Sequence, residues 1–223
     1  MREISIRQLW SRAWDLFKVN WLLLLGLLVI AIIVSLIPLI GALIVGSLLW
    51  PAVIGALIAG ILLMPALVRA GYLVARQGQS SFREAFGDIS LLLKVLIYQF
   101  ILGLIPGSFV GLGHVFMVLM DFHGVILVLV GYHLLFISYL LGWAGPYAIL
   151  SGRAGIFRAI GQSFSLTAQN FGKVFLGLLS FTGLAILGAI PCGVGLLVVG
   201  PMWCVFWPLL YLALTGEEGV SHS

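Results

Sequence analysis

Long stretches without a charged residue are the feature that most limits how this chain can fold. Four such runs cover Val19 to Val68, Val95 to Met120, Phe122 to Gly152 and Val174 to Gly216. A charged side chain at the centre of a bilayer costs about 2.5 to 3.5 kcal/mol by insertion scales, so these runs mark where the chain crosses a membrane. Because 62% of the residues are hydrophobic and only 8% are charged, most of the exterior has to face lipid.

The lengths of these runs predict about six transmembrane helices. One helical crossing takes about 20 residues, so the first and last runs hold two crossings each and the middle runs hold one each. Proline and glycine near Pro38 to Gly41 and near Pro191 to Gly193 indicate hairpin tips. The expected spans are Trp21 to Ile37, Pro51 to Ala75, Leu91 to Ile105, Val125 to Leu150, Phe171 to Ile190 and Gly195 to Leu214.

The basic residues predict the orientation of these spans. Following the chain through six crossings places all eleven Lys and Arg residues at one face of the membrane. An excess of Lys and Arg marks the cytoplasmic side, so we expect both termini in the cytoplasm. The formal net charge of +4 is scattered between apolar spans. It therefore favours anionic lipid over nucleic acid as the partner.

Amphipathic segments precede several of the spans. From Ser5 to Lys18 the polar residues occupy one helical face, and the apolar face consists of Ile6, Leu9, Trp10, Ala13, Trp14 and Phe17. Tryptophan and basic residues suit the headgroup layer, so this segment predicts an interfacial helix on the cytoplasmic side. Similar segments are expected from Ser81, where Ser81 and Glu84 form a capping-box pattern, and after Gly152.

The first and last amphipathic segments can be aligned. The sequence SRAWDLFKVNW from Ser11 matches GQSFSLTAQNF from Gly161, so that Asn20 corresponds to Asn170. At both positions the chain is expected to turn into the bilayer, and each asparagine is expected to cap the new helix with its side-chain oxygen. Ile-Pro pairs follow each segment. We therefore expect one transmembrane domain, 1–223, that contains three units of interfacial helix, span, Ile-Pro break and return span, at 1–79, 80–151 and 152–223.

These two aligned segments resemble the bacterial integral membrane proteins related to the membrane domain of glycerophosphoryl diester phosphodiesterases. The similarity covers nearly the whole chain and implies a polytopic, all-α helix bundle in the bacterial cytoplasmic (inner) membrane. It supplies no catalytic residue. The barrel domain of such a phosphodiesterase takes about 250 residues, for which a chain of 223 residues has no room. Hydrolysis of glycerophosphodiesters is therefore not implied.

Two ionisable side chains are candidates for an intramembrane role. His133 lies inside the fourth expected span, where it relays a proton or binds a substrate, or else is a neutral imidazole hydrogen-bonded between helices. Arg69 follows Pro65 near the inner end of the second span. A kink there would open a niche for a lipid phosphate or carboxylate, whereas snorkelling to the interface explains Arg69 equally simply.

The remaining motifs argue against an enzyme. No nucleotide-binding loop, nucleophile-base set or pair of intramembrane carboxylates is visible, so neither catalytic residues nor a cofactor is expected. His114, Asp121 and His123 have the residue types of metal ligands, but their spacing matches no metal motif and predicts a polar external loop.

The sequence therefore predicts a non-catalytic membrane component that binds lipid or a membrane-protein partner. The expected contacts with anionic lipid are the interfacial arginines, namely Arg7, Arg12, Arg153 and Arg158. The alternative is a transporter or channel for a small or lipidic solute. That function requires one shared cavity lined by polar side chains from several spans, namely Arg69, Tyr98, Gln99, His133 and Ser138.

Overall fold

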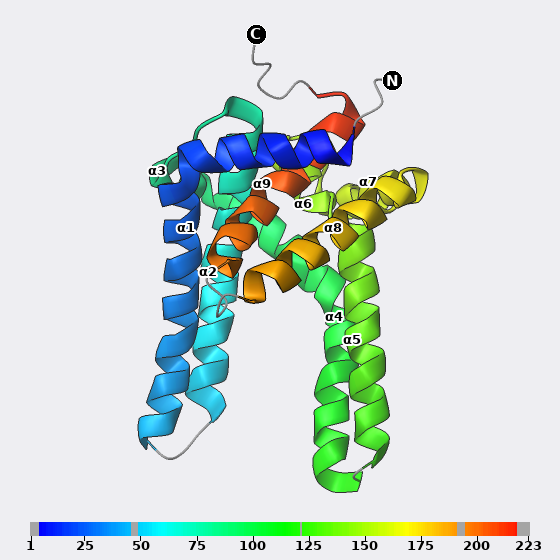
Figure 1. Ribbon diagram of the computed structural model, residues 1–223. Coiled ribbons are helices and arrows are strands. Elements are labelled where there is room, and N and C mark those ends of the chain that lie inside the picture. Colours follow the sequence, from blue (N-terminus) through cyan, green and yellow to red (C-terminus); the bar gives the residue numbers. More distant parts are fainter. Residues whose placement is uncertain (1–4, 46–48, 121, 191–194, 218–223) are drawn as a thin grey trace. The chain divides into compact units, whose positions relative to one another are not determined.

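The computed structural model describes residues 5–45, 49–120, 122–190 and 195–217, with side chains described outside residues 35–62 and 118–123. Every regular element in these ranges is a helix (Figure 1). The helices are α1 (Ile6–Val45), α2 (Leu49–Gln77), α3 (Phe82–Phe86), α4 (Ile89–Met120), α5 (Phe122–Gly142), α6 (Gly145–Leu150), α7 (Ile156–Gln169), α8 (Phe171–Ala189) and α9 (Leu196–Thr215).

The chain is an all-α bundle with several helices suited to a bilayer. Five helical segments in the described residues are long and apolar enough to cross a membrane, namely Ile6–Val34, Ile89–Met117, Gly124–Leu150, Phe171–Ala189 and Leu196–Thr215. The remaining expected span, Pro51 to Ala75, falls on α2, and the side chains of its first half lie outside the described residues. The predicted fold class, a helical membrane bundle, is confirmed.

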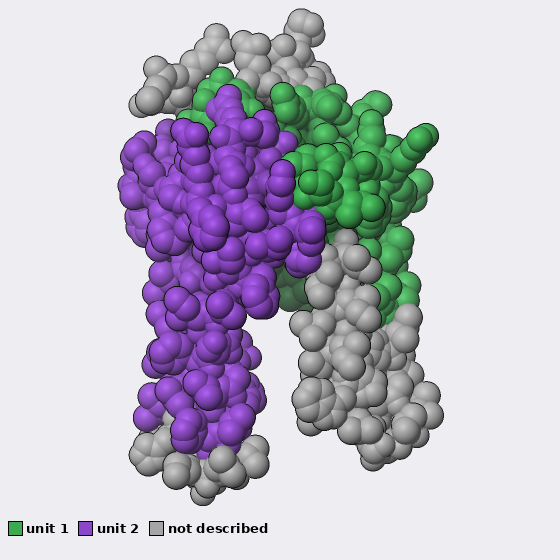
Figure 2. All heavy atoms as spheres, turned by 180° about the vertical axis from the view of Figure 1, so that it is seen from behind, with its two compact units in different colours: residues 1–92, 175–223 green, residues 93–174 purple. Residues whose placement is uncertain are grey.

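The described helices divide into two compact units (Figure 2). Unit 1 consists of residues 1–92 and 175–223, so it combines both ends of the chain. Within it, α1, α2 and α9 pack against one another. Unit 2 consists of residues 93–174 and contains α5, α6, α7 and most of α4. The two units therefore draw on different parts of the chain from the three repeats expected from the sequence.

The first hairpin tip is not where the sequence predicted it. We expected a reversal at Pro38 to Gly41, but α1 continues to Val45 and α2 begins at Leu49. Proline removes one backbone hydrogen bond from a helix, whereas unwinding the helix in lipid would leave several backbone groups unsatisfied. The helix therefore persists beyond the proline.

The same correction applies to the middle Ile-Pro pair but not to the last one. Pro106 lies inside α4, which runs on to Met120 instead of ending at the predicted Ile105. By contrast, α8 ends at Ala189 and α9 begins at Leu196, so a helix boundary does follow near the predicted third break. The expected tip, 191–193, lies outside the described residues. The first two Ile-Pro pairs thus lie within continuous helices.

The first part of α1 is the amphipathic segment predicted from the sequence. Figure 1 shows α1 changing direction, with its dark-blue beginning lying across α9 and the remainder running alongside α2. The expected apolar face is largely buried, and Ile6, Leu9, Ala13 and Phe17 belong to the core of the unit. Trp14 is an exception, because 43% of it is exposed.

Asn20 does not cap the following helix as predicted, because α1 is continuous through it. Its buried carboxamide nitrogen donates to the Leu16 carbonyl at 2.9 Å and to the Gly78 carbonyl at 2.8 Å. Its carboxamide oxygen accepts from the backbone N–H of Ser80 at 3.3 Å. Gly78 directly follows the last residue of α2 and has a φ of 85°. Asn20 therefore fastens α1 to the chain that leaves α2.

Asn170 also binds the turn that precedes it. Its carboxamide nitrogen donates to the Leu166 carbonyl at 3.1 Å, four residues earlier, as Asn20 does with Leu16. The Asn170 backbone carbonyl accepts from the N–H of Val174 at 3.1 Å and so begins α8. The two asparagines share the bond to the carbonyl four residues earlier, but only Asn20 also binds a distant part of the chain, at Gly78 and Ser80. The expected cap on the next helix was wrong for both.

The short helix α3 is built as the sequence predicted. The Ser81 hydroxyl accepts from the backbone N–H of Glu84 at 3.3 Å, and the Glu84 carboxylate accepts from the backbone N–H of Ser81 at 2.8 Å. These reciprocal bonds form a capping box. A four-residue sequence pattern was sufficient to predict this capping box, because its hydrogen-bonding residues are only three positions apart.

Candidate functional site

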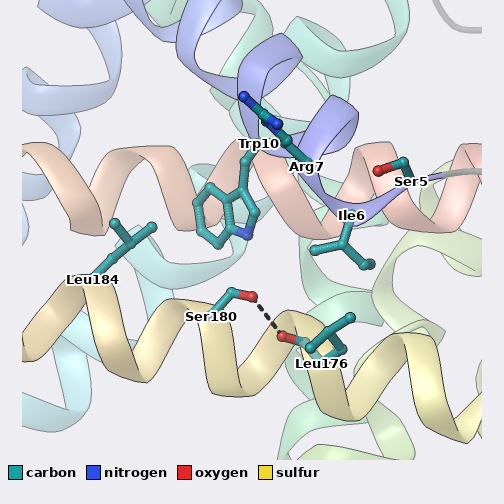
Figure 3. Close-up of a pocket in the computed structure, with 7 residues that line it drawn as sticks. All are labelled: Ser5, Ile6, Arg7, Trp10, Leu176, Ser180 and Leu184. Atoms are coloured by element: carbon teal, nitrogen blue, oxygen red, sulfur yellow. Dashed lines mark hydrogen bonds between the residues drawn. The ribbon is translucent and has the colours of Figure 1, made fainter.

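A groove in unit 1 separates the first part of α1 from α8. It has a volume of about 570 Å³ and is lined by Ser5, Ile6, Arg7, Trp10, Leu176, Ser180 and Leu184 (Figure 3). The three residues from α8 are spaced at i, i+4 and i+8, so they form one stripe along that helix. Ile6 and Trp10 reach from α1 toward this stripe, whereas the Arg7 guanidinium lies at the rim and points away from α8.

The indole of Trp10 forms a wall of the groove and is held by aromatic rings. It stacks on Phe206 of α9 with ring centroids 4.2 Å apart and an interplanar angle of 18°. Phe206 is completely buried and meets Trp207 edge to face, with centroids 5.7 Å apart. A ring stacked on buried neighbours cannot swing freely, so the direction of the Trp10 N–H is set by packing.

This N–H lacks a hydrogen-bond partner within the described residues. The Nε1 atom of Trp10 is shielded from solvent and finds no acceptor there. A buried donor without a partner costs about 1 to 3 kcal/mol. Across the groove, the Ser180 hydroxyl donates to the Leu176 carbonyl at 2.7 Å, so the Ser180 oxygen remains able to accept. The groove therefore combines one fixed donor with a hydroxyl oxygen between apolar walls.

Arg7 gives the rim of the groove a positive charge. Its side chain is exposed, and no carboxylate in the described part of the chain lies within salt-bridge distance of it. Farther along α1, Lys18 does pair with Asp15, at 2.8 Å between Nζ and Oδ1. Both of those side chains are more than half exposed. Asp15 thus offsets the charge of Lys18, whereas no carboxylate in the described residues offsets the charge of Arg7.

The other arginines expected to meet lipid lie on amphipathic helices or beside them. Arg12 is half-buried on the first part of α1, the same part that carries Arg7. In unit 2, Arg153 and Arg158 are exposed, the former in the turn before α7 and the latter within it. The opposite side of α7 is a buried stripe of small residues, Ala159, Ser163 and Thr167. Arginine therefore occupies the outer face of each amphipathic segment.

Within each unit, hydrogen bonds place basic residues at one end of a helical pair. In unit 1 the bond between Asn20 and Gly78 brings together the stretches of chain that carry Lys18 and Arg76. In unit 2 the Tyr98 hydroxyl donates to the Gly142 carbonyl at 2.6 Å and joins the first turns of α4 to the end of α5. Lys94 lies one turn before Tyr98. The basic residues of each pair are therefore found away from its hairpin tip.

The two intramembrane candidates are each engaged with backbone carbonyls. The imidazole Nδ1 of His133 lies 2.7 Å from the Leu129 carbonyl one turn earlier, and the side chain is exposed on α5. Arg69 is half-buried, and its Nη1 donates to the Asp88 carbonyl at 3.2 Å. Arg69 therefore braces the turn between α3 and α4. The bond of His133 is local, whereas that of Arg69 joins α2 to the turn before α4.

Proline explains a polar cluster that the sequence did not predict. The expected span Val125 to Leu150 is interrupted after Gly142, and α6 begins at Gly145. Pro146 has no N–H for the Gly142 carbonyl four residues earlier. The Tyr98 hydroxyl supplies the missing donor. Tyr98, expected to line a transport cavity, is instead fully buried at this break.

Two side chains of α7 satisfy the neighbouring groups at this break. The Ser163 hydroxyl donates to the Leu141 carbonyl at 2.8 Å and accepts from the Ala144 N–H at 3.0 Å. The Thr167 hydroxyl donates to the Ser163 carbonyl at 2.9 Å and accepts from the Trp143 indole at 3.0 Å. These hydroxyls hold α7 against the broken helix and are occupied in doing so.

The polar residues of unit 2 that a transport cavity would require therefore lie in different environments. Tyr98 is enclosed at the helix break, whereas His133 is exposed, and Gln99 and Ser138 are half-buried. Of the expected external loop, His114 is exposed and its Nδ1 lies 2.8 Å from the Val110 carbonyl. Asp121 and the side chain of His123 lie outside the described residues. In the ranges that are described, no three potential ligands gather into a metal site.

The fold and these sites define an α-helical membrane protein that crosses the bilayer several times. Comparisons with protein-family models, with curated proteins and with solved structures find no match. The groove beside Trp10 was not found from the sequence, because its walls come from opposite ends of the chain. The sequence feature that could have indicated this groove is a tryptophan three residues after an arginine on an amphipathic helix.

Proposed function

We propose that this chain is a non-catalytic component of the bacterial inner membrane that binds anionic lipid at its cytoplasmic face. The observation that carries the proposal is the placement of arginine on the outer faces of amphipathic helices whose other faces are buried. Arg7 lies opposite the core contacts of α1, and Arg158 lies opposite the buried stripe of α7. Helices of this type lie in the headgroup layer, where anionic lipid supplies the counter-charge.

The proposed orientation places both termini in the cytoplasm. It is supported by the basic residues of each unit, which gather at the end of a helical pair away from its tip. Lys and Arg near the ends of spans favour the cytoplasmic side. The resemblance to the membrane domain of glycerophosphoryl diester phosphodiesterases agrees with a bacterial inner membrane. On this proposal the arginines both orient the protein and bind lipid.

The polar side chains of the interior support a structural rather than a catalytic use. Tyr98, Ser163 and Thr167 satisfy a helix break, and Asn20 joins α1 to the end of α2. Arg69 supports the turn between α3 and α4. A reaction centre needs groups that converge on a substrate. These side chains instead form hydrogen bonds with the backbone of the protein itself.

The expected strength of lipid binding follows from the charges. A basic residue near an anionic membrane surface contributes about 1 kcal/mol. Four arginines would therefore contribute several kcal/mol, less the opposing effect of nearby carboxylates such as Asp15. Because most of these side chains are exposed, salt should weaken the attraction, with a Debye length of about 10 Å at 0.1 M ionic strength.

The experiment compares anionic and neutral lipid on purified protein. Thermal stabilisation by added phosphatidylglycerol and by phosphatidylcholine is measured for the native protein and for a variant with Arg7, Arg12, Arg153 and Arg158 all changed to Gln. We expect the native protein to prefer phosphatidylglycerol and the variant to lose that preference. The native preference should also decline as salt is raised.

A second variant, with the same four arginines changed to Lys, is the matched control. Lysine preserves the charge but not the planar guanidinium. It should keep most of the preference for phosphatidylglycerol. Equal preference in the native and Gln-substituted proteins, or no response to ionic strength, would refute the proposed lipid binding and leave the arginines a role in orientation alone.

A further inference from the structure

One side of α5 is exposed along much of its length, although the opposite side is tightly packed. Figure 1 shows α5 running alongside α4, and a Cβ added at Gly124 or Gly131 would overlap atoms of α4. The other side of α5 carries large apolar side chains that are 48–54% exposed, namely Ile126, Leu129 and Phe136. The hairpin with α4 accounts for the packed side, whereas the exposed side remains available to lipid or to another helix.

The residues on the exposed side have the spacing of a seam between two helices. They are three, four and three positions apart, in the order Ile126, Leu129, His133 and Phe136. This is the a and d pattern of a coiled coil. Transmembrane helices mostly cross at the same small angle as coiled coils. A second helix would therefore fit along this side of α5 for about three turns.

His133 is the polar member of this row and lies deep in the span. It follows Gly124, the first residue of the candidate span, by nine residues, or about 14 Å along the helix. A charge is costly at that depth, so the imidazole is neutral. Its Nδ1 lies 2.7 Å from the Leu129 carbonyl, which can only accept, so Nδ1 carries the proton. Nε2 is therefore an acceptor, and lipid tails offer it no donor.

A second copy of this chain would supply a donor at the required depth. Two copies inserted in the same orientation, related by a two-fold axis along the membrane normal, present the same residues at the same depth. Two His133 side chains in this state cannot bond to each other, because both Nε2 atoms are acceptors. Tyr132 directly precedes His133, is 57% exposed and carries an O–H donor. In a parallel pair, the hole that receives His133 includes Tyr132 of the second copy.

We propose that the exposed side of α5 is the interface of a parallel homodimer. The Tyr132 hydroxyl of each copy donates to His133 Nε2 of the other, so the two-fold axis generates two hydrogen bonds, and Leu129 and Phe136 pack around them. A single polar residue in an apolar seam can fix the register and the number of helices. A helix of another protein would have to bring its own donor to this depth, whereas the second copy already carries one. The inference does not depend on the proposed binding of anionic lipid.

Energy transfer between copies of the purified full chain, labelled at the C-terminus and reconstituted in liposomes at increasing dilution, tests the proposal. The Kd of the dimer is measured for the native protein, for Tyr132→Phe, for His133→Leu and for the double variant. We expect each single change to raise the Kd about tenfold, because both symmetric hydrogen bonds are lost. The double variant should raise it by about the same factor, because the two residues act as one pair.

The chain offers a matched control for each substitution. Tyr139 lies one heptad after Tyr132 and is 49% exposed, but Leu140 follows it where His133 follows Tyr132. Tyr139→Phe therefore removes the same hydroxyl beside an apolar residue and should leave the Kd unchanged. His114 is exposed on α4, and its Nδ1 lies 2.8 Å from the Val110 carbonyl, so it has the same local contact as His133 but lies outside the seam. His114→Leu should also leave the Kd unchanged. Helical content by circular dichroism establishes that each variant is folded.

The results distinguish this interface from the alternatives. A dimer that dissociates on dilution, and that Tyr132→Phe and His133→Leu weaken while both controls do not, supports the proposal. A chain that stays monomeric at the highest ratio of protein to lipid overturns it, as does a dimer whose Kd responds to neither substitution. Losses that add in the double variant would show that Tyr132 and His133 do not pair across the interface, and would overturn it as well. The same holds if this side of α5 binds a different membrane protein and no dimer forms.

Discussion

Replacing Asn20 by Ala tests whether one buried amide joins α1 to the chain that leaves α2. The side chain is 6% exposed and makes three hydrogen bonds, two as donor and one as acceptor. Alanine removes all three and leaves the Gly78 carbonyl and the Ser80 N–H without these partners. The perturbation acts where α1 meets the end of α2, so it should loosen both helices there.

The magnitude follows from the number and burial of the bonds. One intramolecular hydrogen bond contributes about 0.5 to 1.5 kcal/mol net, and a buried partner left unpaired adds to the loss. Three bonds at a buried position therefore predict a decrease of about 2 to 4 kcal/mol in the free energy of unfolding. Asn170 makes a single described side-chain bond, to Leu166. For Asn170→Ala we expect a decrease of about 1 kcal/mol.

Two measurements check this prediction. The first is unfolding of the purified protein in mixed detergent micelles, followed by circular dichroism, for the native protein and for both alanine variants. The second is limited digestion with trypsin, which cleaves after Arg76 and Arg83 on either side of the loop that Asn20 holds. A released loop opens more often and is cut faster. Asn20→Ala should accelerate cleavage there, whereas Asn170→Ala should not.

Equal losses of stability for the two asparagines would contradict this reasoning, since the structure gives them different numbers of bonds. A loss below about 0.5 kcal/mol for Asn20→Ala, within the range of an ordinary surface substitution, would show that the three bonds do not hold the loop. Unchanged trypsin sensitivity together with a large loss of stability would place the effect elsewhere in the unit.

Three further predictions follow from the packing and the charges. A Cβ at Gly71 would overlap the backbone of α9, so Gly71→Ala should reduce stability by about 1 to 3 kcal/mol in the same unfolding assay, whereas Gly103→Ala, with no atom within 4 Å, should not. Tyr98→Phe removes the 2.6 Å bond to Gly142 and should reduce stability by about 1 to 3 kcal/mol, whereas Tyr139→Phe, which alters an exposed residue, should change it by less than about 0.5 kcal/mol. A reporter fused to the C-terminus should be active in the cytoplasm and one inserted between α4 and α5 should be active outside. The reverse pattern would overturn the orientation.

The sequence was sufficient for features that depend on local spacing. Charge-free runs located the apolar spans, and the residues of α8 and α9 agree with the predicted boundaries to within two positions. The capping box of Ser81 and Glu84 was predicted correctly because its partners are three residues apart. The apolar face of α1 was predicted except for Trp14. These successes share one cause, since helical periodicity and local capping do not require knowledge of the tertiary fold.

The errors arose where tertiary partners change the role of a residue. The sequence predicts helix breaks at Pro38 and Pro106, but both residues lie within continuous helices. Pro146 does coincide with a break, and hydroxyl groups from α4 and α7 satisfy the freed backbone there. Whether a proline interrupts a helix thus depends on donors that are distant in sequence. The predicted cap at Asn20 is wrong for the same reason, because its side chain binds Gly78 and Ser80, which are distant in sequence.

The groove beside Trp10 shows the same limit for the candidate site. The sequence placed Arg7 at a lipid interface and Trp10 on an apolar face, but it did not reveal that α8 lies opposite. That the Trp10 N–H finds no acceptor among the described residues is a property of three-dimensional packing. The depth of His133 in an apolar span makes it a candidate from the sequence, but residue spacing alone does not predict its exposed position on α5.

The hydrogen bonds of Asn20 also set an order of events during biogenesis. Asn20 and the Gly78 carbonyl are separated by 58 positions along the chain. At a synthesis rate of about 5 to 20 residues per second, roughly 3 to 12 seconds pass between the emergence of the two. During that interval Asn20 has its local acceptor, the Leu16 carbonyl, but not its partners Gly78 and Ser80. The amphipathic beginning of α1 therefore gains its hydrogen bond to the end of α2 only after all of α2 has been synthesised.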